Sequence, residues 1–469
     1  MKILFIDDKS EVIYDWVKEL TKIVNLSDKK VESYLLSDRL KSEKSNYFNV
    51  VNIETDIQQK KSIEELQSLY DFSIYESLVT DRNITNYTSF NNIYKYNNNS
   101  YSESLKSYIN AFDYLFREEI DIIFTGLADN FKFNLAWRIA EFYNKKFYIF
   151  YALYWFNDGL MISDRYDQTS SVINHLYNKY YTEEILDSEK NQLKNIFENK
   201  QVSFNFSDNK VYPFLKRLTF IKNKQGTYES LSIKNFILRK INFYFSNIVK
   251  KVYIDRKYKN IIGLEEEYLL FPLHVAPEAT LLGANPELAD QFSLIKNISI
   301  HLPYGVKLYV KEHPAQIFGY DLNYEFYIKL FSLNNVEIIK AKESAYELLS
   351  HKKCLGMIVI NGTLGLESAL KYRKPIFVLG NIYYKIADCF IKLDNYKDIF
   401  SWIQKIQKKE WTFDEHALWA ILKAINSSVV RSKEVDYSRC KSWKEYDSMK
   451  KYTYKEIILK ELEYEVPKE

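Results

Sequence analysis

The chain has few of the residues that mark unusual backbones or covalent cross-links. Its 469 residues include only 11 glycines, 8 prolines and 3 cysteines, whereas average usage would give about 55 glycines and prolines together. This scarcity excludes collagen-like, glycine-linker and proline-rich disordered chains. The cysteines, Cys354, Cys389 and Cys440, are far apart and odd in number, which indicates a reducing compartment and no disulfide framework. We therefore expect a cytoplasmic protein.

The chain also lacks a large excess of charge of one sign and long apolar runs. The 65 basic and 62 acidic residues nearly cancel, so we expect no nucleic-acid partner. No run approaches the about 18 apolar residues of a membrane span, and the apolar run after Lys2 is too short for a signal peptide. What the chain does contain is 40 tyrosines, 30 phenylalanines and 7 tryptophans. Side chains of this kind need a buried core, so the chain is globular.

Residues 1–164 carry the pattern of a first Rossmann-like domain. Ile3 to Ile6 form a short apolar run, and apolar residues recur at helical spacing from Val12 to Ile23. The stretch from Asp121 to Leu153 then alternates an apolar run, a helical pattern and a second apolar run. This βαβ order favours a parallel sheet.

Residues 165–262 predict a helical connecting segment that is partly basic. Within it, Lys234–Lys259 alternates apolar residues with eight lysines and arginines. Such a helix either contacts an anionic membrane surface or bridges two domains with a solvated basic face.

Residues 263–400 predict the second Rossmann-like domain, and residues 401–469 predict C-terminal helices. Eight of the 11 glycines and six of the eight prolines fall between 261 and 380. The apolar pattern there alternates strands (268–273, 306–310, 336–339, 357–360 and 376–379) with helices (285–302, 345–349 and 364–372). Asn285 followed by Pro286 predicts a capped start for the first of these helices. The pattern favours a doubly wound α/β domain.

Ligands of such domains bind beyond the carboxyl ends of the strands, and polar residues follow three of them. His274 and Glu278 follow the first strand, where a carboxylate can act as nucleophile or general base. Lys311, His313 and Pro314 follow the second strand and suit a phosphate. An ordinary solvated loop and a surface turn are the alternative interpretations.

The third such segment opens a helix. Asn361, Gly362, Thr363, Gly365 and Glu367 stand between a strand and a helix start, where small residues and the helix dipole favour an anion. The glycine spacing matches neither a Walker loop nor the dinucleotide fingerprint. The remaining histidines show no metal-ligand spacing, so we predict no metal site.

The three segments together resemble the bacterial capsule polysaccharide biosynthesis family, which includes retaining β-Kdo transferases. His313 lies 35 residues after Glu278 (313 − 278), and Glu367 lies 54 residues after His313 (367 − 313). The resemblance implies a GT-B-like fold, in which two Rossmann-like domains face a cleft and the second holds a nucleotide sugar. It also implies that the C-terminal helices, residues 401–469 here, pack back on the first domain.

The resemblance also implies roles for individual residues. Lys311, His313, Thr363 and Glu367 fall on the elements that bind the cytidine monophosphate portion of the donor. Glu278 falls on the catalytic Asp of the family's Gln-x-x-x-Asp pattern, and His274 falls on its Gln. Both positions depart from the pattern, although Glu278 preserves the carboxylate.

The function expected from the resemblance is transfer of a 2-keto-3-deoxy sugar, Kdo or a nonulosonic acid, from a CMP-activated donor to a glycan or glycolipid acceptor. We expect no metal or other cofactor. Asn130 and Asp158, at predicted strand ends of the first domain, are the expected acceptor contacts. The expected location is cytoplasmic, or peripheral on the inner face of the cytoplasmic membrane through Lys234–Lys259. Two alternatives are a polyol-phosphate transferase with a CDP-glycerol donor and a non-catalytic, membrane-docked assembly protein.

Overall fold

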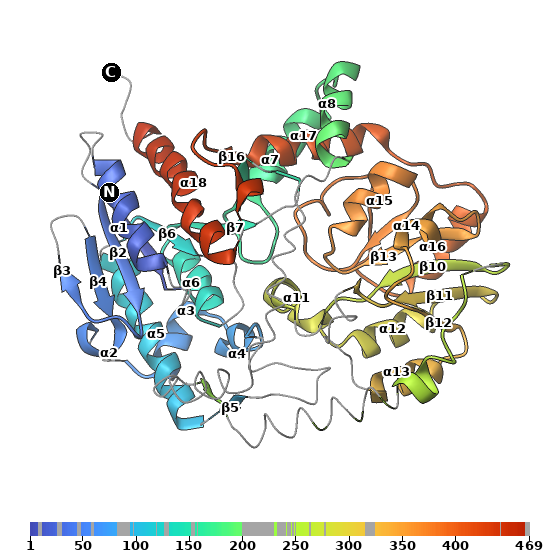
Figure 1. Ribbon diagram of the computed structural model, residues 1–469, viewed down its shortest axis with the longest axis horizontal. Helices are drawn as coiled ribbons and strands as arrows, with labels where there is room; N and C mark the ends of the chain where they lie inside the picture. The colour runs from blue at the N-terminus through green and yellow to red at the C-terminus, as the bar shows by residue number, and fades with distance from the viewer. Residues whose placement is uncertain are drawn as a thin grey trace.

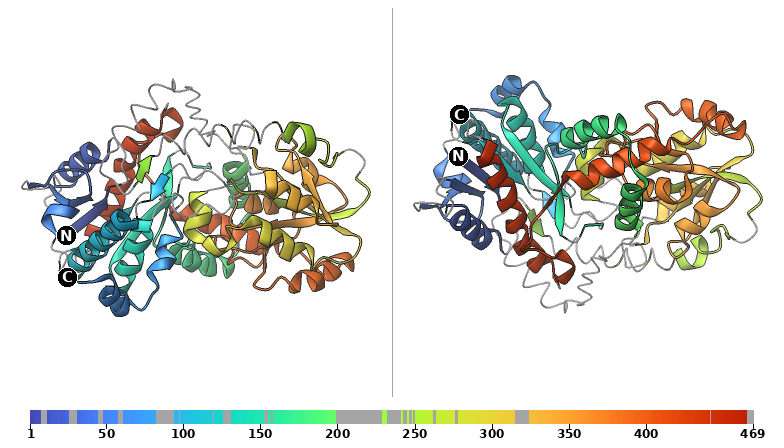
Figure 2. Two further views of the ribbon diagram at one scale, coloured as in Figure 1. Left: turned by 90° about the horizontal axis from the view of Figure 1, so that it is seen from below. Right: turned by 90° about the horizontal axis from the view of Figure 1, so that it is seen from above.

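The structure is a computed structural model in which two lobes lie side by side (Figures 1 and 2). Each lobe is built on a largely parallel sheet. The described residues are 1–464 without 8–11, 26–30, 45–47, 58–60, 82–93, 97, 119, 126–130, 152–154, 157, 199–228, 232–240, 242–244, 246–247, 249, 262–263, 276–277, 315–323 and 441.

The N-terminal lobe contains a sheet of order β16-β8-β7-β6-β1-β2-β4-β3. Its parallel strands are β1 (Lys2–Ile6), β2 (Glu32–Ser37), β4 (Phe48–Asn52), β6 (Ile122–Thr125) and β7 (Lys146–Tyr151). Antiparallel strands close both edges: β3 (Glu43–Lys44), β8 (Gly159–Ser163) and β16 (Val429–Arg431).

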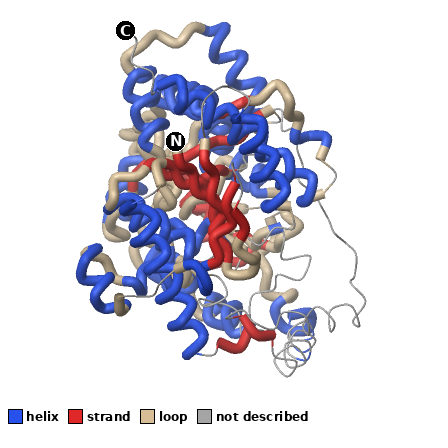
Figure 3. The backbone as a smooth tube through the Cα atoms, turned by 90° about the vertical axis from the view of Figure 1, so that its left-hand side faces the viewer, coloured by secondary structure: helices blue, strands red, loops and turns tan. Residues whose placement is uncertain are grey.

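Helices cover both faces of this sheet (Figure 3). On one face, α1 (Ile13–Asn25) and α18 (Trp443–Tyr464) bury apolar side chains together with Ile3 and Phe5 of β1. On the other face, Leu4 and Ile6 share a core with α3 (Ile63–Tyr70), α5 (Asn98–Glu118) and α6 (Phe131–Phe142). The alternation along β1 places successive side chains on opposite faces of the sheet. The short helices α2 (Ile53–Asp56) and α4 (Ile74–Leu78) complete this lobe.

The C-terminal lobe contains a parallel sheet of order β12-β11-β10-β13-β14-β15. Its strands are β10 (Glu267–Pro272), β11 (Val306–Lys311), β12 (Val336–Ile339), β13 (Cys354–Val359), β14 (Ile376–Val378) and β15 (Ile391–Lys392). Its helices are α11 (Ala279–Ala284), α12 (Gln291–Ser299), α13 (Tyr324–Phe331), α14 (Ala345–Ser350), α15 (Leu364–Tyr372) and α16 (Asp398–Gln407).

Three helices lie along the upper side of both lobes (Figure 1). α7 (Ser171–Tyr181) and α8 (Asp187–Glu198) leave the N-terminal lobe, and both pack against α17 (Glu415–Ser428). α17 runs directly into β16, which pairs with β8 of the N-terminal sheet. The chain therefore returns to its first lobe after completing the second.

The predicted α/β fold class, with two Rossmann-like parallel sheets, is confirmed. The predicted continuous helix over 285–302 is wrong, because it is divided into a 3₁₀ turn at Pro286–Leu288 and α12. Asp290 caps α12 by accepting from the Ser293 amide, whereas Asn285 makes no such cap. The Asn285 side chain instead pairs with the backbone N–H and carbonyl of Asn381, at the end of β14.

The described part of the middle segment also includes β9 (Glu229–Leu231), which pairs with β5 (Tyr94–Tyr96), and a π-helical turn, η1 (Lys250–Ile254). No helix among the described residues has the length and apolar character needed to cross a membrane.

Candidate functional site

The connectivity of the C-terminal sheet identifies the edge where a ligand is expected. From β10 the chain moves to β11 and then β12 on one side, and it continues on the other side from β13 to β14 and β15. The reversal between β10 and β13 is a topological switch point, where loops separate and leave a crevice at the carboxyl ends. All three segments singled out from the sequence follow β10, β11 and β13, which are neighbours in the sheet.

The segment after β10 pairs its two predicted catalytic residues. His274 is buried, and its Nδ1 lies 2.7 Å from Oε2 of the half-buried Glu278. The Thr280 hydroxyl donates to the other oxygen, Oε1, at 2.7 Å. Burial opposes ionisation of Glu278, but the His274 ring, the Thr280 hydroxyl and nearby His313 stabilise the carboxylate, so its pKa lies below the usual value.

The ionised state of Glu278 determines the tautomer of His274. A carboxylate only accepts hydrogen bonds, so Nδ1 of His274 must donate, and whenever the ring carries a single proton Nε2 is left as an acceptor. Nε2 faces Gly362 in the segment after β13, because a Cβ built on that glycine would lie 4.0 Å from it. The basic nitrogen is therefore directed from the β10 loop toward the β13 loop.

Gln291, at the start of α12, fixes the backbone of His274. Its Oε1 accepts from the His274 amide at 2.8 Å, and its Nε2 donates to the His274 carbonyl at 3.2 Å. Gln291 is fully buried, so this two-point contact holds the imidazole at the strand end. The sequence analysis missed Gln291, and a polar residue at the start of an otherwise apolar helical pattern was the available signal.

The segment after β11 is held by a buried carboxylate. Glu312 accepts from the Tyr258 hydroxyl at 2.6 Å, from the Ala341 amide at 3.0 Å and from the Tyr327 hydroxyl. Lys311 donates to the carbonyls of Glu312 and Ala341 at 3.0 and 3.1 Å. Its predicted phosphate contact stays a prediction, and this buried placement favours a supporting role for the loop.

His313 lies close enough to Glu278 and His274 for their charges to affect it. Burial lowers the pKa of His313, with the opposing effect of Glu278 too small to reverse it. The ring is therefore neutral at pH 7, and it can meet a phosphate as a hydrogen-bond donor rather than as a full charge. Pro314, which follows it, is exposed.

The segment after β13 forms a tight turn into α15. The Gly362 carbonyl accepts from the buried Tyr384 hydroxyl at 2.6 Å. A Cβ on Gly365 would lie 2.4 Å from that hydroxyl oxygen, so only glycine permits this contact. Glu367 is buried and accepts from the hydroxyls of Tyr346 and, at 3.4 Å, Thr363. The N-terminus of α15 thus opens at the same edge as His274 and His313.

A residue of the N-terminal lobe, Gln168, joins two of these segments and was also missed. Its Nε2 donates to the Thr280 carbonyl at 3.2 Å, and its Oε1 accepts from Nδ2 of Asn361 at 3.2 Å. Asn361 Nδ2 donates to the same Thr280 carbonyl at 3.0 Å. Gln168 has a φ of 63°, a left-handed conformation that is uncommon for a residue with a side chain.

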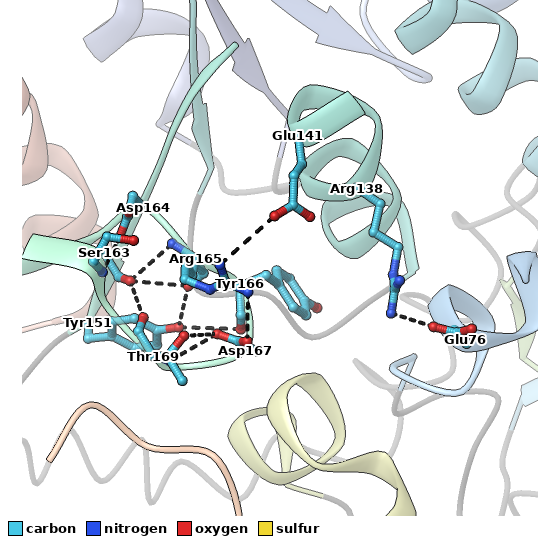
Figure 4. A network of polar contacts seen from close by, with 11 residues as sticks. Glu76, Arg138, Glu141, Tyr151, Ser163, Asp164, Arg165, Tyr166, Asp167 and Thr169 are labelled. Atoms are coloured by element: carbon cyan, nitrogen blue, oxygen red, sulfur yellow. Dashed lines mark hydrogen bonds and ion pairs between the residues drawn. The ribbon is translucent and has the colours of Figure 1, made fainter. Parts of the chain in front are cut away.

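The loop after β8 holds Gln168 in that conformation (Figure 4). The Ser163 hydroxyl donates to the Thr169 carbonyl at 2.6 Å, and Asp167 accepts from both the amide and the hydroxyl of Thr169. Arg165 of the same loop forms ion pairs with Glu141 and Asp167. These local contacts offset the strained backbone. Sequence spacing gave no signal for Gln168, because its partners are 112 and 193 residues away.

The contacts of Asn361 leave one polar atom unsatisfied. The Thr280 carbonyl can only accept, so it fixes Nδ2 of Asn361 toward it and directs Oδ1 elsewhere. Oδ1 is buried and has no partner among the described residues. Leaving a buried acceptor unpaired costs about 1 to 3 kcal/mol, so this atom is suited to accept from a bound ligand.

The two predicted acceptor contacts have different outcomes. Asp158, at the start of β8, forms an ion pair with Arg431 of β16 at 3.0 Å, so its described contact lies within the N-terminal lobe rather than at the edge of β10. Asn130 lies outside the described residues, as does Pro277 in the His274 to Glu278 segment. Within the described part of the chain, no three His, Cys, Asp or Glu side chains group as metal ligands would.

The fold and this edge together define a class: a two-lobed α/β protein whose second lobe carries a candidate ligand site with a His–Glu pair and a helix N-terminus. The family follows from the sequence match. A model of the family "Capsule polysaccharide biosynthesis protein" matches residues 166–458, which is more than half of the chain. The protein belongs to this family.

The comparison with solved structures gives matches of low identity and low TM-score. KpsC, a beta Kdo 2,4 transferase from Thermosulfurimonas dismutans, is 13% identical, with 65% of this chain and 79% of that chain covered and a TM-score of 0.35. A UDP-GlcNAc 2-epimerase from Neisseria meningitidis is 13% identical over 91% and 99% of the two chains, with a TM-score of 0.24. A glycosyltransferase from Rickettsia africae is 8% identical over 99% and 97%, with a TM-score of 0.24. None of the curated proteins compared with the chain matches it significantly.

Proposed function

We propose that the protein is a glycosyltransferase that moves a 2-keto-3-deoxy sugar, Kdo or a nonulosonic acid, from a CMP-activated donor to a glycan or glycolipid acceptor. The observation that carries the proposal is the His274–Glu278 pair, which lies at the switch point of the C-terminal sheet and is electrostatically coupled to His313. Membership of the capsule polysaccharide biosynthesis family supports the same class of reaction.

The donor is proposed to lie across the carboxyl ends of β10, β11 and β13. The N-terminus of α15 favours the phosphate through its dipole, and neutral His313 donates a hydrogen bond to it. Asn361 Oδ1 accepts from a hydroxyl or amino group of the donor. These protein groups stabilise a departing monophosphate, so the proposal includes no metal cofactor.

In the proposed transfer, the acceptor oxygen attacks the anomeric carbon while the bond between that carbon and the CMP phosphate oxygen breaks. CMP leaves with the bonding electrons. The acceptor proton moves to Nε2 of His274, and Glu278 stabilises the imidazolium that forms. Both oxygens of Glu278 already accept hydrogen bonds, which favours this supporting role over direct attack by the carboxylate.

The same pair also favours one second candidate, a transferase that moves a polyol phosphate from a CDP-linked donor. There the hydroxyl deprotonated by His274 would attack phosphorus instead of carbon, and CMP would again be released. The two candidates differ in the donor, because Nε2 of His274 can accept a proton from the acceptor hydroxyl in either reaction.

The experiment is to incubate the purified full chain with CMP-Kdo, a CMP-nonulosonic acid and CDP-glycerol in turn. Released CMP and the product mass are measured with a capsule glycan as acceptor. CMP release with a CMP-sugar supports the proposal, and release with CDP-glycerol alone replaces it with the second candidate. Binding of CMP without turnover of any donor would favour the non-catalytic alternative.

Glu278→Gln is the matched chemical test, with Glu287→Gln as its control. Glu287 is exposed and lies in the 3₁₀ turn after α11. Glu278→Gln keeps the size of the side chain but no longer stabilises an imidazolium, so CMP release should fall by about 10²-fold or more while CMP still binds. Normal turnover by Glu278→Gln would remove the catalytic assignment.

A further inference from the structure

A fourth strand-end segment, residues 380–384, borders the proposed donor site. β14 is the neighbour of β13 in the sheet, so the residues that follow β14 leave the sheet at the same edge as Asn361. The Gly380 amide donates to the carbonyl of Ile360 at 3.1 Å, which joins the two segments one residue before Asn361. Residues 380–384 therefore start beside the segment that opens α15.

Contacts on two sides hold this fourth segment in place. The Asn285 side chain pairs with the backbone of Asn381, and a Cβ on Gly380 would lie 2.6 Å from Oδ1 of the buried Asn285. Only glycine permits so close an approach. At the other end of the segment, the Tyr384 hydroxyl donates to the Gly362 carbonyl at 2.6 Å. The segment is thus fixed against the turn into α15.

Tyr383 carries a polar group that these contacts do not use. The side chain is buried, and its hydroxyl has no hydrogen-bond partner among the described residues. The ring packs edge-to-face against Tyr384, with the ring centroids 5.5 Å apart, which places Tyr383 close to the same turn. Burial, and after it the charge of Glu367, raise the pKa of Tyr383 above its ordinary value of 10.0. The hydroxyl therefore keeps its proton at pH 7.

Two buried polar atoms without a described partner thus border the turn into α15, Oδ1 of Asn361 and the hydroxyl of Tyr383. An amide oxygen only accepts hydrogen bonds, whereas a phenol hydroxyl both donates and accepts. Buried polar groups of folded proteins are nearly always paired. A ligand that brings hydroxyl groups to this turn would pair both atoms.

The proposed position of the donor phosphate indicates which part of the donor reaches Tyr383. The phosphate is proposed to lie at the N-terminus of α15, which begins at Leu364. In CMP the ribose is separated from the phosphate by one methylene group, and the base lies on the far side of the ribose. The ribose is also the part of the nucleotide that carries two neighbouring hydroxyl groups. It is therefore the part that suits Tyr383 both in position and in chemistry.

We propose that the Tyr383 hydroxyl binds a ribose hydroxyl of the donor nucleotide, which makes Tyr383 a further specificity-determining residue. The inference rests on the proposed function, because the phosphate position comes from it, and it adds that the donor must be a ribonucleotide. Tyr383 takes no part in the transfer itself. Its removal should weaken donor binding without slowing the chemical step.

The test is isothermal titration calorimetry of the full-length protein with CMP, 2′-deoxy-CMP and 3′-deoxy-CMP. Tyr383→Phe removes only the hydroxyl group, so we expect CMP affinity to fall about fivefold, as for one neutral hydrogen bond. The unchanged protein should prefer CMP over at least one of the two deoxynucleotides, and Tyr383→Phe should lose that preference. With CMP-Kdo as donor, KM should rise by the same factor while kcat stays within about twofold.

Tyr309→Phe is the matched control. Tyr309 is also a buried tyrosine whose hydroxyl has no partner among the described residues, but it lies within β11, where its ring stacks on Tyr268 at 4.2 Å. Tyr309→Phe should bind all three nucleotides as the unchanged protein does. Neither variant should lower the urea midpoint, because each removes a buried hydroxyl without a described partner. A lower midpoint for Tyr383→Phe with unchanged affinity would overturn the proposal in favour of a structural role.

The remaining outcomes separate this proposal from the proposed function. CMP affinity that is unchanged in Tyr383→Phe, or that falls equally for CMP and both deoxynucleotides, would overturn the role of Tyr383 and leave the proposed transfer intact. If the unchanged protein binds UMP but not CMP, the CMP donor is wrong, and UMP with its two deoxy forms gives the same test of Tyr383. Binding of neither nucleotide would contradict both proposals.

Discussion

The two lobes have the same kind of topological switch point but differ in how the polar groups beside it are paired. In the N-terminal sheet, β1 lies between β2 and β6, and the buried Asp7 follows β1. Arg39 donates to both oxygens of Asp7, at 2.7 and 3.0 Å, and the Ser37 hydroxyl donates at 2.6 Å. In the C-terminal sheet, the corresponding edge leaves Asn361 Oδ1 buried without a partner among the described residues and Glu278 half-exposed.

This contrast separates a strand-end edge whose charged groups pair within the lobe from one that we propose to hold a ligand. Burial opposes ionisation of Asp7, but Arg39, Lys132 and Ser37 lower its pKa, so the carboxylate is ionised and fully used inside the lobe. Glu278 is ionised by similar means, yet its partner His274 directs a free nitrogen to the next loop. A topological switch point alone is therefore insufficient evidence of a ligand site. The distinguishing evidence is a polar group at that edge that has no partner among the described residues.

The largest effect should come from His274. His274→Asn keeps a hydrogen-bonding side chain but removes the proposed base, so CMP release should fall by about 10² to 10⁴-fold. The measurement is CMP release at saturating donor. His175→Asn, an exposed histidine on α7, is the control and should keep full activity. Equal activity in both variants would show that His274 is not the catalytic base. The C-terminal edge would then have no more evidence of catalysis than the N-terminal edge.

The next effect concerns the stability of the N-terminal edge. Asp7→Ala leaves Arg39 without its carboxylate and removes the negative charge that lies near Lys132, so it should lower the free energy of unfolding by about 3 kcal/mol. Urea unfolding measures it, with the exposed Asp15→Ala as the control. CMP affinity should not change in Asp7→Ala, since the donor is proposed to lie on the other lobe. A large loss of CMP affinity without loss of stability would instead place the donor at the N-terminal edge.

A smaller effect should follow from the residue that joins the two lobes. Gln168→Ala removes the contacts to Thr280 and Asn361, so kcat/KM for the donor should fall about tenfold, as expected for one or two hydrogen bonds. Gln168→Glu tests the same point through charge, because an acidic side chain repels the Thr280 carbonyl. Asp164→Asn, elsewhere in the same loop, is the control. Unchanged kcat/KM in both Gln168 variants would mean that the bridge does not position the site.

The smallest effect is the pH dependence of stability. The folded pKa of His313 lies below its ordinary value of 6.5, so the unfolded chain binds more protons and stability falls as pH drops below about 6.5. The folded pKa of Glu278 is also lowered from 4.5, so its contribution is lost at still lower pH. His313→Gln should flatten the fall between pH 7 and 5.5, whereas His175→Gln should not, as measured by urea midpoints. An unchanged slope would contradict the assignment of a neutral, half-buried His313.

The sequence predicted those features that depend on local pattern. The strands and helices of the second lobe follow from alternating apolar runs, and the three strand-end segments follow from polar residues placed directly after them. The division of the 285–302 helix was missed, because Asn285 has the sequence of a cap but its side chain is used 96 residues away, at Asn381. Gln291 and Gln168 were missed for the same reason. Their partners are set by tertiary contact, which a single sequence does not display.

The C-terminal segment that returns to the first lobe affects the order in which the two lobes can fold. β16 and α18 complete the sheet and one face of the first lobe, and α18 shares a core with β1 and α1. During synthesis, the N-terminal part of the first lobe is therefore made before the helix that covers one face of its sheet. Until α18 has been synthesised, Phe5, Trp16 and Phe124 lack their ring contacts with Tyr454. The second lobe is contiguous in sequence and can form before the first is finished. The half that carries the proposed donor site is therefore the part of the newborn chain that can fold earliest.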